Sequence, residues 1–235
     1  MLILAFETSA KACSVAVHDG QKLLGESFQN TGLTHSQTLM TMAEDLLENC
    51  GKAASDVTHL AVAAGPGSFT GVRIGVAAAK GWAWGAELPV YGVSTLESMA
   101  LSLGAWNGHV CACMDARRNQ VYNAIFLADS GKLERVSEDR AISLAELKEE
   151  LEHIDGPVYL VGDGAALTYK TLGADLKELI LPPEHRCQQR ASGVALAALA
   201  AMEAGESADG AALQPNYLRL SQAERERLEK QNKAE

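Results

Sequence analysis

The order of apolar segments along the chain constrains its fold more than any other sequence feature. Apolar runs and turn residues predict strands at 2–6, 14–18, 22–27, 60–64 and 90–93. Capping boxes at Thr34-x-x-Gln37 and Ser94-x-x-Glu97, together with apolar periodicity, predict helices at 34–51, 68–85 and 94–104. Asp19-Gly20 is typical of a hairpin turn between the second and third strands. The first half therefore reads as three antiparallel strands followed by alternating helices and strands.

The second half of the chain repeats this order more loosely. Strands are predicted at 110–114, 121–127, 133–136 and 158–161, and helices at 143–153, 165–172 and 193–204. Such an order is that of a ribonuclease-H-like unit, and two in tandem predict the two-lobed α/β architecture of actin and hexokinase. The predicted lobes are residues 1–104 and 105–220, and a charged tail at 221–235 is expected to be a solvated, frayed helix or disordered.

Composition narrows the class of protein. The 235 residues carry a net charge of −10, from 20 basic and 30 acidic residues, which argues against wrapping nucleic acid unaided or adhering to an anionic membrane. No apolar run approaches the ~20 residues that span a bilayer. The five cysteines are an odd number without a Cys-x-x-Cys pair, so we expect reduced thiols and a cytoplasmic protein.

One alternating set of possible metal ligands, His109, Cys111 and Cys113, falls on a predicted strand. At ~3.3 Å per residue its first and last members lie ~13 Å apart, too far for one tetrahedral ion to gather all three. The six histidines include no pair spaced by one helical turn. We therefore expect no metal site.

The most specific motif is the glycine-rich stretch from Ala64 to Gly75, which joins a buried strand to a helix. Its amides and the helix N-terminus suit an anion, although neither a Walker loop nor a dinucleotide fingerprint is present. A tight turn capped by Ser68 is an equal alternative. With the turn after the first strand, which contacts phosphate in actin-like ATPases, it defines a weak, vestigial phosphate site: Glu7, Thr8, Ser9, Gly65, Gly67 and Ser68.

The helix after this motif carries Gly71, Gly75 and Ala79 at four-residue intervals, which gives it a face almost without side chains. A second helix can approach such a face closely. Two interpretations stay open: packing within the same lobe, or an interface with another subunit.

Several motifs together resemble one known family. They are Ile3–Ser9, His35–Gln37, Gly65–Gly75, Gly92–Leu96, Asp115–Arg117 with Val121-Tyr122, and Pro215–Arg219. In these stretches the chain is similar to the TsaB family. The resemblance implies an actin-like fold and a role in bacterial synthesis of threonylcarbamoyladenosine beside the tRNA anticodon. It also implies partnership with the catalytic paralogue TsaD and with the ATPase TsaE, while TsaC supplies the donor.

The residues themselves oppose catalysis by this chain. Aligned on the glycine-rich stretch, the metal-binding histidine pair of TsaD falls on Thr95 and Met99, neither of which replaces an imidazole. Lys11 and Ala12 stand where the paralogue has acidic residues, and the 115–120 hairpin lacks glycine. The hypothesis is a non-catalytic scaffold that requires no cofactor, at most shares weakly bound ATP or ADP with its partners, and meets tRNA only indirectly. Contact of Arg117, Arg118, Arg219 and the tail arginines with RNA stays open as an alternative, although exposed charges are usually just solvated.

Its first lobe is expected to pair with the equivalent lobe of TsaD, and with a second copy when TsaD is absent. The interface residues expected are His35, Leu39, Met42, Gly71, Val72, Arg73, Gly75 and Val76. Two alternatives are weighed against this hypothesis. One is a nucleotide-dependent phosphotransferase or ATPase; the other is a peptidase, for which no credible Ser/His/Asp set is visible.

Overall fold

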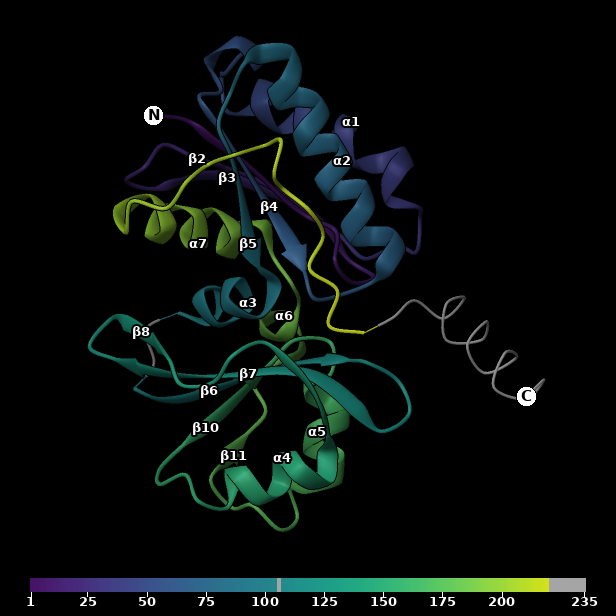
Figure 1. Ribbon diagram of the computed structural model, residues 1–235, viewed down its shortest axis with the longest axis vertical. Helices are drawn as coiled ribbons and strands as arrows, with labels where there is room; N and C mark the ends of the chain where they lie inside the picture. The colour runs from purple at the N-terminus through teal and green to yellow at the C-terminus, as the bar shows by residue number, and fades with distance from the viewer. Residues whose placement is uncertain (105–106, 220–235) are drawn as a thin grey trace, which may run out of the picture.

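The computed structural model describes residues 1–104 and 107–219 and consists of two lobes, each built on one mixed sheet (Figure 1). The predicted start of the second lobe, residue 105, lies outside these described residues. The charged tail predicted at 221–235 lies wholly outside them. None of the described helices has the length and apolarity to cross a lipid bilayer. The α/β, two-lobed prediction is confirmed.

The first lobe contains a five-stranded sheet in the order β3-β2-β1-β4-β5. Its strands are β1 (Ile3–Glu7), β2 (Cys13–His18), β3 (Leu23–Gln29), β4 (His59–Gly65) and β5 (Val90–Ser94). The strands β1, β2 and β3 are antiparallel neighbours, whereas β4 and β5 run parallel to β1. The strands β1 and β2 are buried on both faces, so they read as continuous apolar runs.

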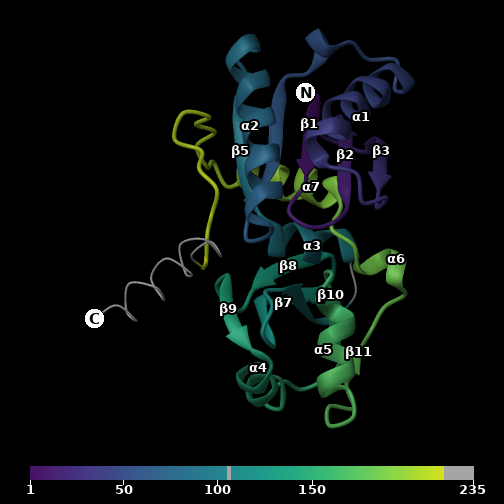
Figure 2. The same cartoon turned by 90° about the vertical axis from the view of Figure 1, so that its right-hand side faces the viewer.

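Helices cover both faces of this sheet. The helices α1 (His35–Asn49) and α2 (Phe69–Ala86) pack on one face, where Leu39, Val72 and Val76 join the side chains of Leu4 and Phe6. On the other face lies α7 (Ala191–Glu203), an Ala-rich helix (Figure 2). A short turn, η1 (Ala54–Asp56), precedes β4.

The second lobe holds a sheet in the order β11-β10-β6-β7-β8, and β9 also pairs with β7. Its strands are β6 (Gly108–Asp115), β7 (Gln120–Asp129), β8 (Lys132–Arg135), β9 (Arg140–Ser143), β10 (Val158–Val161) and β11 (Leu179–Ile180). Its helices are α4 (Leu144–Leu151), α5 (Ala165–Leu172) and α6 (Glu184–Cys187). The helices α4 and α5 pack on one sheet face, and α3 (Thr95–Leu103) packs on the other, between the lobes.

The end of the described chain belongs with the first lobe, although the predicted lobe 105–220 includes it. The start of α7 is held there by Glu26 of β3, whose carboxylate accepts from the Ser192 amide at 2.9 Å and pairs with Arg190 at 3.0 Å. This carboxylate supplies the N-terminal cap that Arg190 lacks. Long-range capping of this kind leaves no local sequence signal.

The predicted caps of the other helices differ in outcome. Ser68, Ser94 and Ser143 each accept from an amide of the first turn, and Ser143 with Glu146 forms the full capping box. The capping box predicted at Thr34 and Gln37 is wrong, because no side-chain cap forms and the Gln37 amide bonds to the Thr34 carbonyl instead. The short elements β9, β11 and α6 were not predicted.

Candidate functional site

A cleft of about 510 Å³ separates the two lobes and is the candidate site. The first lobe lines it with residues 9–11 and 66–69, and the second with residues 114–117, Tyr122 and Asp163. Residues 216–219 complete the lining. The carboxyl ends of β1 and β4 meet here because parallel neighbours direct these ends to the same edge of their sheet, and β6 of the second sheet ends at the other wall.

The predicted phosphate residues are divided by the fold. Ser9, Gly67 and Ser68 line the cleft, whereas Glu7 and Thr8 lie beneath it and Gly65 faces a neighbouring cavity. A Cβ on Gly67 would lie 2.6 Å from the Ser9 carbonyl oxygen, so this glycine serves the approach of two loops of the protein itself. The Ser68 amide donates to Ser9 O at 2.6 Å, and the Gly71 amide to Ser68 Oγ at 3.3 Å. Because these two amides already donate to groups of the protein, the geometry favours the tight capped turn over a phosphate site.

Glu7 is fully buried below the cleft. Its Oε1 accepts from the Ser9 amide at 2.6 Å, and its Oε2 has no hydrogen-bond partner. Burial raises the pKa of Glu7 from its usual value of 4.5 to about 7, against the lowering effect of the Ser9 hydrogen bonds. Burial therefore disfavours the charged form of this carboxyl.

The second lobe contributes two further carboxylates, Asp115 and Asp163, to the cleft. Gln189 donates to Asp163 Oδ1 at 2.9 Å, but its own Oε1 is buried without a partner. Desolvation and the nearby Asp115 charge raise the pKa of Asp163. Among the described residues, no cluster of three or more His, Cys, Asp or Glu side chains is arranged to hold a metal ion.

The two positions aligned with the metal-binding histidine pair of TsaD are inaccessible to a ligand. Thr95 and Met99 are both completely buried in α3, and Met99 packs within the core of the second lobe.

Cys111 and Cys113 are buried on one strand with their sulfurs 3.5 Å apart, while His109 is only half-buried. These three side chains therefore form part of a strand face.

The turn between β6 and β7 takes an unusual backbone conformation. Arg117, Arg118 and Asn119 have φ values of +67°, +57° and +56°. Such left-handed backbone costs a residue with a Cβ roughly 1–2 kcal/mol. The Arg117 amide donates to Asp115 Oδ1 at 2.8 Å, and the Leu144 amide to the Asn119 carbonyl at 3.2 Å, which hold the turn in place. The missing glycines thus do not prevent a glycine-type turn.

Most of the predicted interface lies inside the first lobe, so that set of residues is corrected. Leu39, Met42, Gly71, Val72, Gly75 and Val76 are all buried. Thr8 Oγ1 donates to the Gly71 carbonyl at 2.8 Å, and a Cβ on either glycine would collide with Thr8. The small-residue face packs against the loop after β1, as the alternative interpretation held.

Two of the predicted interface residues remain accessible in part. Arg73 is exposed, and His35 is half-buried with its Nε2 2.8 Å from the Ala10 carbonyl oxygen. The outward face of α2 continues from Arg73 through Ala77 and Gly81 to Trp84, whose exposed fraction is 88%. Helical spacing from Arg73 identifies this face in the sequence, but periodicity alone does not say which of two small-residue faces is buried.

A C-terminal strap, residues 207–219, runs along the first lobe and across to the second. Tyr217 stacks on Phe69 at a ring separation of 4.4 Å, and Arg73 Nε donates to its hydroxyl at 2.7 Å. The Asn216 amide donates to the Ala64 carbonyl at 2.6 Å. Arg219 reaches the second lobe and donates to the Ala116 carbonyl at 2.7 Å. The strap therefore joins both walls of the cleft.

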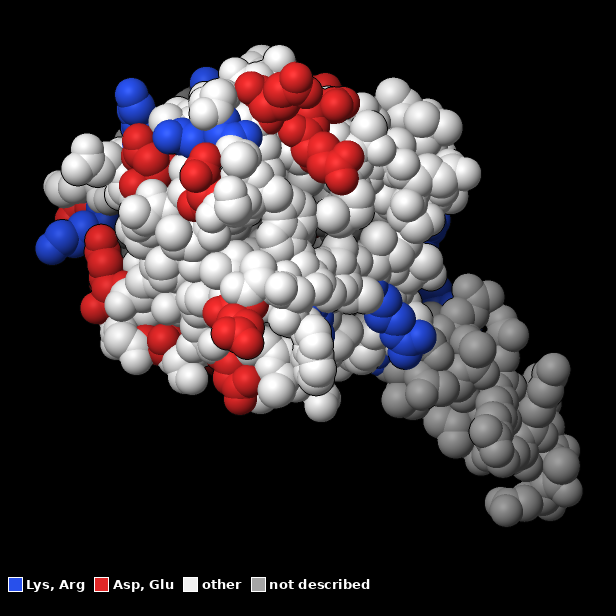
Figure 3. All heavy atoms as spheres, turned by 90° about the horizontal axis from the view of Figure 1, so that it is seen from above, with Lys and Arg blue, Asp and Glu red and all other residues white. Residues whose placement is uncertain are grey.

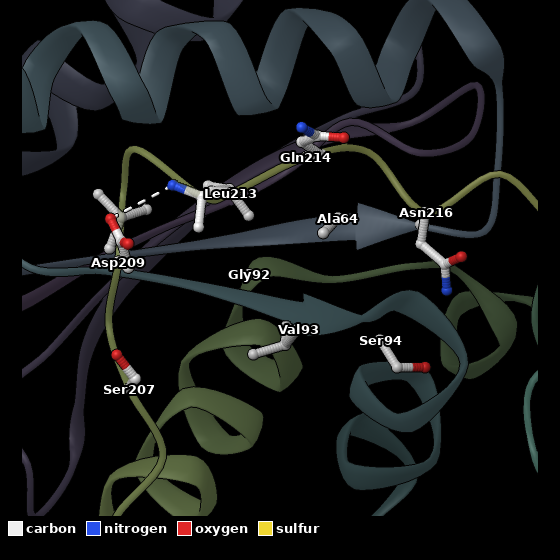
Figure 4. A pocket seen from close by; sticks show the side chains of 12 residues that line it. Ala64, Gly92, Val93, Ser94, Ser207, Asp209, Leu213, Gln214 and Asn216 are labelled. Atoms are coloured by element: carbon white, nitrogen blue, oxygen red, sulfur yellow. Dashed lines mark hydrogen bonds between the residues drawn. The ribbon is translucent and has the colours of Figure 1, made fainter.

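The strap also encloses a second cavity of about 520 Å³ against β4 and β5 (Figure 4). Leu213 points over Gly92, where a Cβ would collide with it, and the Leu213 amide donates to the Asp209 carbonyl at 3.0 Å. Asp209 is the one charged residue in the lining. The cavity therefore lies between the strap and the two strands, and its lining is mainly uncharged.

The two sheets, the helix α3 between them and the interlobe cleft define the class: an actin- and hexokinase-like two-lobed fold. The sequence model of the TsaD family, described as tRNA N6-adenosine threonylcarbamoyltransferase, matches residues 29–227. YeaZ from Pseudomonas aeruginosa superposes with a TM-score of 0.72 at 27% identity, covering 92% of this chain and 99% of YeaZ.

Curated relatives narrow this class to one family. The tRNA threonylcarbamoyladenosine biosynthesis protein TsaB of Bacillus subtilis is 35% identical over 233 residues, which cover 98% of this chain and 100% of that protein. TsaB of Escherichia coli is 41% identical over 170 residues, 70% of this chain and 72% of the relative. The chain belongs to the TsaB family.

Proposed function

We propose that this chain is the non-catalytic subunit required for threonylcarbamoyl transfer to the tRNA adenosine beside the anticodon. The observation that carries the proposal is similarity to TsaB of Bacillus subtilis along 98% of the chain. The role is that of a scaffold, which binds TsaD, holds it in an active shape and supports the binding of TsaE.

The cleft supports a role without catalysis. Lys11 places an ammonium group at its wall, and burial disfavours the charged form of Glu7 beneath it. Thr95 and Met99 are fully buried and do not belong to the lining of the cleft. The Lys11 charge opposes a divalent cation here, and phosphoryl chemistry depends on such a cation.

The outward face of α2 is the surface proposed for TsaD. Ala77 and Gly81 allow a second helix to approach closely, and no atom lies within 4 Å of a Cβ added at Gly81. Trp84 offers an exposed aromatic anchor of the kind that dominates protein interfaces. The same surface would join two copies when TsaD is absent.

Reconstitution tests the proposed function. This chain, TsaD, TsaE, the TsaC product and tRNA are mixed, each is omitted in turn, and modified adenosine is measured. We expect no modification without this chain. Full modification in its absence would contradict the proposal.

Calorimetry with Mg-ATP on the isolated chain tests the alternative of a nucleotide-dependent phosphotransferase or ATPase. We expect weak binding at most and no hydrolysis. Tight binding with hydrolysis that is lost in Glu7→Ala would favour the alternative instead.

A further inference from the structure

No cation that lines the cleft forms an ion pair with a described acidic residue. All six ion pairs between described residues involve Arg135, Arg140, Lys148 or Arg190, none of which lines the cleft. Lys11, Arg117 and Arg219 line it from three separate segments. The same lining holds two carboxylates, Asp115 and Asp163, so cations exceed anions there by one, in a chain whose net charge is −10. Seen from above, the end of the first lobe away from the cleft carries groups of both acidic and basic side chains (Figure 3).

An aromatic pair lies in the same cleft. Phe69 and Tyr217 both line it and stack at 4.4 Å with 26° between their planes. The Arg73 guanidinium lies 3.7 Å from the Phe69 ring centre and fixes the pair from the helix side. Tyr217 keeps 39% of its surface exposed. Aromatic rings beside cations are the pattern that binds unpaired nucleic acid, because every base has a face that stacks.

One buried polar group also faces this space without a partner. Ser9 lines the cleft, is fully buried, and its Oγ makes no hydrogen bond. It lies beside the N-terminus of α2, whose cap Ser68 is exposed. A free hydroxyl can donate a hydrogen bond to a phosphate oxygen.

We propose that the mouth of this cleft binds a single-stranded segment of RNA. Lys11 and Arg117 contact its phosphates from the two walls, and one unstacked base lies on Tyr217. The inference rests on the proposed function, since it gives the subunit a direct contact with an unpaired part of its tRNA. A free nucleotide is disfavoured because the loop amides at Ser68 and Gly71 are already engaged and do not cradle a polyphosphate.

The test measures RNA affinity of the full chain in complex with TsaD. The probes are an RNA hairpin with an unpaired loop, a fully paired duplex of the same stem, and ATP. We expect the hairpin to bind most tightly, Tyr217→Ala to weaken it roughly tenfold, and Lys11→Ala or Arg117→Ala to reduce the salt slope by about 0.7 each. Tyr217→Phe keeps the ring and should keep the affinity.

Matched controls separate the cleft from general effects. Tyr169 is 40% exposed on α5, so Tyr169→Ala removes an equally exposed ring, and Arg186→Ala removes an exposed guanidinium away from the cleft. Both should leave hairpin affinity unchanged. Equal binding of the duplex, displacement of the hairpin by ATP, or equal losses in the controls would overturn the inference.

The outcome is distinguishable from failure of the proposed function. If reconstituted modification does not need this chain, the proposed function fails. If modification needs the chain but Lys11→Ala, Arg117→Ala and Tyr217→Ala all bind the hairpin normally, only the RNA contact is refuted. Circular dichroism of each variant shows whether the fold is retained, and Arg117→Ala tests the contact without altering the strap.

Discussion

At the scale of single residues, Glu7 has the greatest consequence for how the cleft behaves. Its side chain is buried with one oxygen unpartnered, so the charged form is disfavoured in the folded protein. The rise in its pKa from 4.5 to about 7 corresponds to roughly 3 kcal/mol. The fold therefore accommodates the neutral, protonated form of Glu7 better than its charged form.

We predict that Glu7→Gln stabilises the protein in a pH-dependent manner. The folded state holds this proton more tightly than the unfolded state, so the free energy of unfolding of the unaltered protein falls as pH rises from about 4.5 to about 7. The variant lacks this loss and should be more stable at pH 8 by up to about 3 kcal/mol, and little changed near pH 4.5. Urea unfolding at both pH values measures the difference; an equal difference at both would contradict the prediction.

At the scale of elements, α2 has two small-residue faces with opposite environments. Gly71 packs against the Thr8 backbone, whereas a Cβ on Gly81 meets open space. The loop after β1 therefore covers the face that carries Gly71, whereas the face that carries Gly81 leaves room for a partner. The two faces differ in what surrounds them rather than in their own composition.

A matched pair of substitutions tests this assignment. We predict that Gly71→Ala destabilises the protein by about 2 kcal/mol or more, because its Cβ collides with Thr8. Gly81→Ala should instead stabilise it by about 0.8–1.0 kcal/mol through helix propensity alone. Thermal or urea unfolding of both variants measures these changes; destabilisation by Gly81→Ala would show that its face is covered.

The helix α2 also shows which features of the fold could be predicted from the sequence and which could not. Hydrophobic periodicity and turn residues predicted every long strand and helix, because those signals are local. The burial of Gly75 depends on Thr8, which is distant in sequence, and the return of α7 depends on Glu26 of β3. The exposure of Trp84 likewise follows from tertiary packing, so the cleft could be anticipated in outline but the interface could not.

At the scale of the whole molecule, the strap links the lobes on either side of the cleft. Tyr217 fastens it to α2, and Arg219 fastens it to the hairpin of the second lobe. The start of the strap is held by Lys80, which donates to the carbonyls of Ala211 and Leu213 at 3.3 and 3.0 Å. The lobes are thereby held around a cleft lined by both cations and carboxylates, while Ala77, Gly81 and Trp84 of α2 stay exposed.

The central claim is that this chain acts by docking TsaD through the outward face of α2, and co-purification of Gly81→Glu with TsaD tests it most directly. The added carboxylate has space in the isolated chain, so the fold should be kept. Ala166→Glu, on an exposed position of α5, is the matched control. The account predicts that Gly81→Glu loses TsaD and the control retains it; undiminished recovery of TsaD with Gly81→Glu would contradict it.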